Sequence, residues 1–204
     1  MADGHVPRSE QGRTPLDDWL LGALEIMLGR ERGLSRLDPS ETGFVTSFWG
    51  IALAGLVDAF VLFVRHGRFA ADHAASAWSA PAYVLTHLGV AALAYGASLL
   101  ALYLLARSPE HAARFPLAVT ASNWAAPVVS LAIVPLAFLG TVGQQGTGGV
   151  FLALMVLAAL AIAGTRLIRI PFRLDLGRAV LWFVTTALVS QVVLEGMEAF
   201  LGLR

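Results

Sequence analysis

Five long apolar segments decide what this chain can fold into. Each holds about 20 or more mostly apolar residues, the length that an α-helix needs to cross a hydrocarbon core of about 30 Å. They cover residues 43–64, 81–105, 115–139, 148–168 and 178–201. The links between them are too short to form a second globular domain. The pattern predicts an all-α polytopic membrane protein, in which a five-helix transmembrane bundle (43–204) follows a polar N-terminal segment (1–42).

Composition supports this class and excludes several others. Hydrophobic residues make up 57% of the chain and charged residues only 14%, against about 25% charged residues in an ordinary soluble domain. The formal net charge is zero, so no nucleic acid partner is expected. Cysteine and lysine are absent, which excludes thiolate metal sites, a P-loop and Schiff-base cofactors. We therefore expect no catalytic residue, no metal and no cofactor, and a protein that is not an enzyme.

The arginines predict an orientation. Positively charged residues are retained on the cytoplasmic side of a membrane. With the N-terminus inside, eleven of the fourteen arginines fall on the cytoplasmic side and three outside. This asymmetry predicts a cytoplasmic N-terminus and a periplasmic C-terminus. The arginine-only, alanine-rich composition is typical of a GC-rich bacterial genome, which makes a bacterial inner membrane the expected location.

The N-terminal segment contains a predicted amphipathic interfacial helix at about 15–30. Asp17, Asp18 and Glu25 lie largely off its apolar stripe, so its polar face is acidic, which argues against attraction to anionic lipid and favours docking on protein. Two placements stay open: a helix tucked under its own bundle, or one that binds a partner. The apolar stripe follows a spacing of three and four residues and consists of Leu16, Leu20, Ala23, Leu24, Met27 and Leu28.

Four polar residues fall inside the predicted spans, at one depth. At 1.5 Å per residue, Asp58, Gln191 and Glu195 lie roughly 20 to 25 Å from the cytoplasmic ends of their helices. His87 enters its span from outside and falls in the same layer of a core about 30 Å thick. Ionisable groups at membrane depth usually face the bundle interior. Asp58, His87, Gln191 and Glu195 therefore form a candidate intramembrane polar cluster.

Three interpretations of this cluster remain open. Asp58 and His87 can share a proton in low dielectric, as a proton or cation site that opens to the external side. The four side chains can instead form interhelical hydrogen bonds that stabilise the packing of the helices. In the third interpretation, His87 and Glu195 meet water near the membrane surface without touching Asp58.

Asn123 and Pro127 mark a candidate helix-kink site in the third span. Proline removes a backbone donor and kinks a helix, and neighbouring polar side chains often satisfy the freed carbonyls. A helix broken at mid-membrane is a common way to build a transporter site. Prolines of this kind also shape bundles without any further role.

The fourth span and the link after it offer two more features. Residues 150–164 include no polar side chain, so this span is expected to face lipid or another subunit. Arg166, Arg169 and Arg173 then follow at spacings of three and four, on one helical side. They can grip anionic headgroups, although topology alone also requires cations here.

The topology and the alanine-, glycine- and proline-rich helices resemble the Yip1-like five-helix membrane proteins. The stretch RLDPSETGFVTSFW also resembles a segment of small uncharacterised multipass proteins of proteobacteria. The Asp-Leu-Tyr-Gly-Pro type motif of Yip1 proteins is not present in this sequence. The resemblance implies a five-span fold with the N-terminus inside, and no site residue carries over from it.

Two functions are compatible with these features. The first is a non-enzymatic integral membrane protein that acts as a scaffold, accessory or assembly subunit of a membrane complex. Its expected partners are the lipid bilayer and either a membrane protein or further copies of this chain. The alternative is a small proton- or cation-linked transporter or channel component that uses Asp58 and His87.

Overall fold

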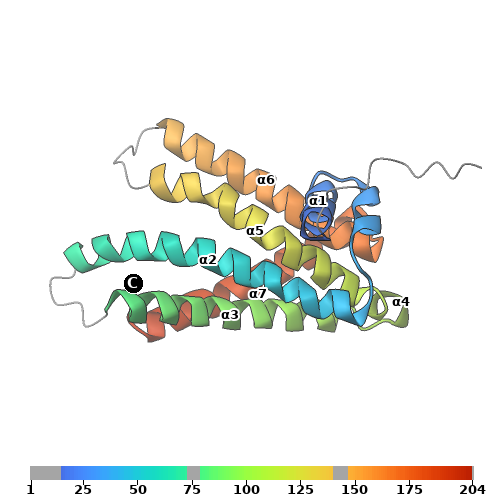
Figure 1. Ribbon diagram of the computed structural model, residues 1–204, viewed down its shortest axis with the longest axis horizontal. Helices are drawn as coiled ribbons and strands as arrows, with labels where there is room; N and C mark the ends of the chain where they lie inside the picture. Colours follow the sequence, from blue (N-terminus) through green and yellow to red (C-terminus); the bar gives the residue numbers. More distant parts are fainter. Residues whose placement is uncertain (1–14, 73–78, 140–146, 204) are drawn as a thin grey trace, which may run out of the picture.

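The computed structural model describes residues 15–72, 79–139 and 147–203, and the regular secondary structure in them is entirely helical. Figure 1 shows the helices, which are α1 (Pro15–Met27), the 3₁₀ helix η1 (Glu31–Arg36), α2 (Glu41–Asp72), α3 (Ala80–Leu105), α4 (Pro109–Ala112), α5 (Phe115–Leu139), α6 (Thr147–Phe172) and α7 (Leu176–Phe200). Five of them, α2, α3, α5, α6 and α7, are long and apolar enough to cross a membrane. This confirms the predicted all-α class with five helices of spanning length.

Helix α2 begins one residue after a serine cap. The Ser40 hydroxyl accepts a hydrogen bond from the Gly43 N–H at 3.1 Å, which satisfies one of the free donors of the first turn. Asp38 precedes this cap, and its carboxylate accepts the Ser40 N–H at 2.9 Å. The Ser40 N–H and hydroxyl hold the pKa of the Asp38 carboxyl below its ordinary value.

Helix α6 is longer than the segment 148–168 suggested, because it continues through the expected link to Phe172. Pro171 lies in its last turn, where the loss of one backbone hydrogen bond does not break the helix. The guanidinium of Arg114 donates to the Pro171 carbonyl at 3.5 Å. Only Arg173, Leu174 and Asp175 separate α6 from α7, and Asp175 caps α7 by accepting the Arg178 N–H at 3.0 Å.

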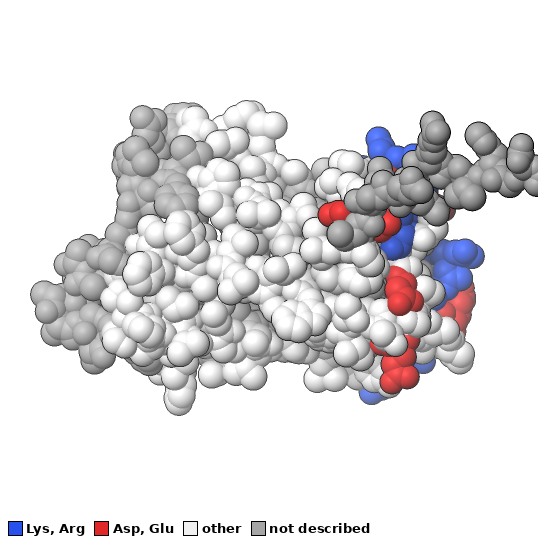
Figure 2. All heavy atoms as spheres, in the orientation of Figure 1, with Lys and Arg blue, Asp and Glu red and all other residues white. Residues whose placement is uncertain are grey.

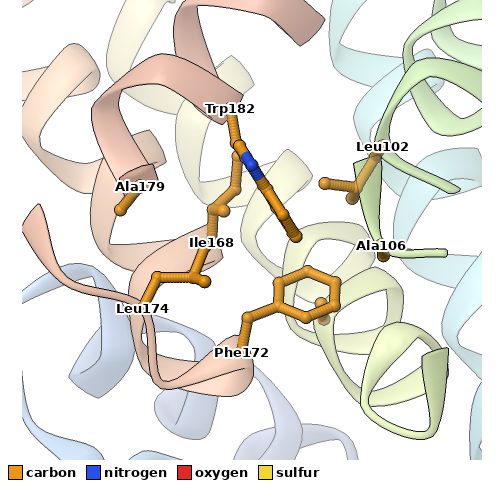
Figure 3. Close-up of a cluster of buried hydrophobic side chains, with 8 residues drawn as sticks. Leu102, Ala106, Ile168, Phe172, Leu174, Ala179 and Trp182 are labelled. Carbon is orange, nitrogen blue, oxygen red and sulfur yellow. The ribbon is translucent and has the colours of Figure 1, made fainter. Parts of the chain in front are cut away.

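An apolar cluster holds the α6–α7 hairpin against α3 and α5 (Figure 3). The rings of Phe172 and Trp182 meet edge to face with their centroids 5.3 Å apart, a favourable arrangement for aromatic pairs. Phe172 is completely buried. Burial of this ring explains why the helix extends past the point where its sequence predicts an end.

Helix α1 lies across the bundle. Figure 1 shows it nearly end-on, while the five long helices run along the length of the molecule. Trp19 stacks on Trp124 of α5 with ring centroids 5.0 Å apart, and Ala23 and Ile26 are fully buried. Of the two placements considered from the sequence, the structure shows the helix packed on its own bundle, against α5 and α6.

The buried and exposed sides of α1 are not the ones predicted from its apolar stripe. Glu25 is buried, with 8% of its surface exposed, while Leu16, Leu24 and Leu28 of the expected buried stripe are exposed. The cause is a set of ion pairs with η1: Glu25 pairs with Arg32 at 3.0 Å and with Arg36 at 3.4 Å. Because this carboxylate is neutralised on the inner side of the helix, the outward side is left rich in leucine.

Charged side chains gather at the α1 end of the molecule. Figure 2 shows the blue and red atoms of this face at that end, and an uncharged surface along the middle. An uncharged band beside a charged end is the distribution expected where spanning helices emerge at a membrane surface.

The core also lies in the half of the bundle near α1. Helix α5 is the centre of this core. Half of the residues in its apolar stretch (50%) are buried, against 11% to 22% in the other four spanning helices. In the described part, no residue of α2 after Ala54 and none of α5 after Pro127 is buried. The contact between α2 and α5 is therefore thinly packed away from α1, whereas Tyr83 and His87 of α3 are buried at that end.

Gly50 sets the approach of α2 to α5. A Cβ placed on Gly50 would lie 2.3 Å from the Asn123 carbonyl oxygen and 2.8 Å from its carbonyl carbon. Pro127 has no N–H to offer this carbonyl within the helix. The glycine Cα hydrogens face the carbonyl instead, an arrangement that recurs between closely packed helices.

We predict that Gly50→Ala destabilises the protein, because the new methyl group forces two backbones apart. The expected cost is about 1 to 3 kcal/mol, measured as a fall in melting temperature in detergent. Gly55→Ala, in the same helix, is the control, since a Cβ there meets no heavy atom within 4 Å. Equal melting temperatures for the two variants would contradict the assigned contact.

Candidate functional site

Two polar side chains among the described residues have no exposed surface, Asn123 of α5 and Ser47 of α2. Asn123 donates a hydrogen bond from Nδ2 to Ser47 Oγ at 2.8 Å. The hydroxyl of Tyr95 on α3 donates to Asn123 Oδ1. Ser47 in turn donates to the Phe44 carbonyl at 2.6 Å. One amide thereby connects three helices, and its oxygen and its nitrogen both have partners.

This network changes the interpretation of the helix-kink site. Helix α5 is one continuous helix across both prolines, from Phe115 to Leu139, so it is not broken at mid-membrane. The Asn123 amide does not serve the carbonyl that Pro127 leaves free, because it is committed to α2 and α3. Asn123 and Pro127 together form a packing site for α2. The Asn123 amide contacts Ser47 and the Asn123 carbonyl contacts Gly50, one helical turn further along α2.

Asp58 lies on the line of α2 that faces α5, but its side chain is exposed. Its carboxylate interacts with the Ser130 hydroxyl of α5. The expectation that Asp58 faces the bundle interior is therefore only partly met: the residue lies at the edge of the α2–α5 contact. The reason is the thin packing described above, because no buried residue of α2 or α5 covers the contact at this level.

His87 is buried in α3, and its two ring nitrogens have different neighbours. Nδ1 lies 2.9 Å from the Tyr83 carbonyl oxygen, and it must donate, because a carbonyl only accepts. Nε2 faces the Glu198 carboxylate of α7 at 3.9 Å. The centroid of the Tyr83 ring lies 4.1 Å from that of the His87 ring and 5.2 Å from that of the His66 ring of α2.

Gln191 and Glu195 form a pair of their own on α7. Gln191 Nε2 donates to Glu195 Oε1 at 2.6 Å, and both side chains are exposed. The expectation that they face the bundle interior is wrong. The buried line of α7 runs through Ala179, Trp182 and Thr186, and Gln191 and Glu195 lie on the opposite side of the helix.

The predicted four-residue cluster thus divides into separate contacts. Asp58 and His87 are not paired with each other: the carboxylate beside His87 is Glu198, and the polar neighbour of Asp58 is Ser130. Sequence reasoning did not identify Ser47, Tyr95, Ser130 or Glu198. The position of each of these residues along its helix can be counted from the sequence. The rotation of the helix about its axis, which decides what the side chain faces, cannot.

Among the described residues, no group of three or more His, Asp or Glu side chains is placed to hold a metal ion. Comparison of the chain with protein families, curated proteins and solved structures found no match.

We predict that Tyr95→Phe lowers stability by about 1 kcal/mol, because it leaves a buried Asn123 oxygen without its donor. The melting temperature in detergent measures the effect. Tyr103→Phe on the same helix is the control, since Tyr103 is 52% exposed. A double-mutant cycle with Ser47→Ala tests coupling through the shared amide, and strictly additive losses would argue against one network.

Proposed function

We propose that this protein is a non-enzymatic integral membrane protein that works as an accessory or assembly subunit of a membrane complex. In the proposed topology it resides in a bacterial inner membrane with the N-terminus in the cytoplasm, which matches the arginine distribution. A Yip1-like relationship remains a prediction from topology.

The observation that carries this proposal is the outward polar pair on α7. Exposed residues follow one side of the second half of this helix at spacings of three and four: Ala187, Leu188, Gln191, Val192, Glu195, Gly196, Ala199 and Phe200. Gln191 and Glu195 bond each other in the middle of this side, and exposing a carboxylate and an amide to lipid tails is costly. A helix of another protein, or of a second copy, offers both donors and a close-packing surface.

Helix α6 supplies a second outward surface. Six consecutive residues, Val150–Met155, are all exposed. Since successive residues are rotated by about 100° around a helix, six of them cover its full circumference. This part of α6 has no buried side against its own bundle, which suits a protein that is covered by neighbours as well as by lipid.

We predict that the double substitution Gln191→Leu with Glu195→Leu abolishes recovery of the stoichiometric complex in mild detergent. The control is Thr186→Val, which makes the same polar-to-apolar change on the inward side of α7, where the hydroxyl bonds its own helix at 3.0 and 2.9 Å. Size-exclusion chromatography with mass spectrometry identifies the partner as another protein or a second copy.

Single-cysteine crosslinking in native membranes provides an independent measurement, because the chain has no cysteine of its own. A cysteine at Val192 is expected to crosslink to the partner, and one at Leu56 on α2 is expected not to. A complex that survives the double leucine substitution, together with equal crosslinking at the two positions, would remove the support for the proposal.

A proton- or cation-linked transporter component using Asp58 and His87 is the second candidate. The observation that favours it is the line of His66, Tyr83, His87 and Glu198 across α2, α3 and α7. Such a line places several titratable groups in contact within the bundle.

Flux measurements in proteoliposomes distinguish the two functions. A transporter predicts a pH-driven flux that Asp58→Asn and His87→Gln each abolish, since neither replacement can exchange a proton. The accessory role predicts no flux with the wild-type chain and unchanged complex formation by both variants.

A further inference from the structure

A cavity of about 690 Å³ lies at the charged end of the molecule, between η1 and the last turns of α6. Its wall combines guanidinium groups with apolar side chains and short polar ones. The lining residues are Gly29, Glu31, Leu34, Ser35, Arg166, Arg169, Ile170, Arg173 and Leu174.

Three arginines converge on this cavity, and the structure holds one of them firmly. Arg166 donates from Nη1 to the Met27 carbonyl at 3.0 Å. It lies against Gly29, where a Cβ would come within 3.3 Å of the Arg166 Cζ. Gly29 has a φ of 86° and ends α1, so the glycine both terminates that helix and makes room for the guanidinium.

Arg169 and Arg173 are exposed to the cavity. Among the described residues, no carboxylate lies within ion-pair distance of either guanidinium. The arginines of η1 differ, because Arg32 and Arg36 are matched by Glu25 and Asp18. Glu31 is the one carboxylate among the lining residues, so the formal charge around the cavity is about +2.

Arg173 occupies a backbone position that normally selects glycine. Its φ is 54°, and it ends α6 with the hydrogen bonds Leu174 N–H to Arg169 carbonyl and Arg173 N–H to Ile170 carbonyl, at 3.0 and 3.3 Å. Glycine is preferred at this position because a Cβ is strained there. The chain instead places a third guanidinium at the cavity, and strained residues of this kind cluster at ligand sites.

We propose that this cavity binds a phosphate group, carried by an anionic phospholipid headgroup or by a free phosphate compound. Arg169 and Arg173 contact the phosphate oxygens with their paired N–H groups, and Arg166 supplies charge from the wall. Leu34, Ile170 and Leu174 provide apolar surface beside the charged groups. Leu28, the residue before Gly29, is 56% exposed.

The test measures binding by the purified full chain in nanodiscs. One arm compares phosphatidylcholine alone with phosphatidylcholine plus phosphatidylglycerol, and the other adds inorganic phosphate against matched sodium chloride. Retained phosphatidylglycerol is counted by native mass spectrometry, and the melting temperature reports both ligands. Stabilisation by phosphatidylglycerol alone assigns a lipid headgroup, and stabilisation by inorganic phosphate assigns a free compound.

The variants separate this site from general surface charge. We predict that Arg169→Gln and Arg173→Gly each weaken binding about tenfold or more, since each removes a charge-assisted contact. Arg173→Gly is expected to melt no lower than wild type without ligand, because glycine suits the backbone position. Glu31→Gln is expected to bind more tightly, because it removes the opposing carboxylate.

Arg107→Gln is the matched control, because it loses one exposed positive charge outside the cavity. It is expected to bind like the wild type. Loss of binding in Arg107→Gln equal to that in Arg169→Gln would overturn the proposal, and so would the absence of a response to both ligands.

Discussion

The close contact between α2 and α5 is the constraint on which most of this bundle depends. Gly50 brings the α2 backbone onto the Asn123 carbonyl, and the Asn123 side chain then reaches Ser47 and Tyr95. Without water, each buried polar group must find its partner inside the protein. The same turn of α5 carries Trp124, on which α1 stacks. Backbone contact, polar network and interfacial helix are therefore fixed at one level.

The charged end of the molecule has two parts with different electrostatics. Around α1 and η1, the carboxylates of Asp18 and Glu25 neutralise Arg32 and Arg36, and this pairing holds Glu25 on the buried side of α1. Beside the last turns of α6, Arg169 and Arg173 lack such carboxylates in the described structure. The arginines of this end therefore divide into a neutralised set around η1 and a set that surrounds a cavity.

Polar residues of the spanning helices fall into three environments with different consequences. Asn123 is fully enclosed and acts in packing. Asp58 is exposed at the edge of the α2–α5 contact beside Ser130, and His87 is buried in α3 with Glu198 beside it. Gln191 and Glu195 point away from the bundle. The outward polar pair on α7 is the observation on which the proposed assembly role depends.

Hydrophobic length is a local property, so the sequence by itself determined the all-helical class and the five helices of spanning length. Their rotation and register are not local. They depend on a few close contacts, such as Gly50 on Asn123 and Phe172 on Trp182, and these decide which side of each helix is covered. For that reason only the tertiary structure placed Glu198 beside His87, turned Gln191 and Glu195 outward, paired Glu25 with the arginines of η1, and carried α6 through Pro171.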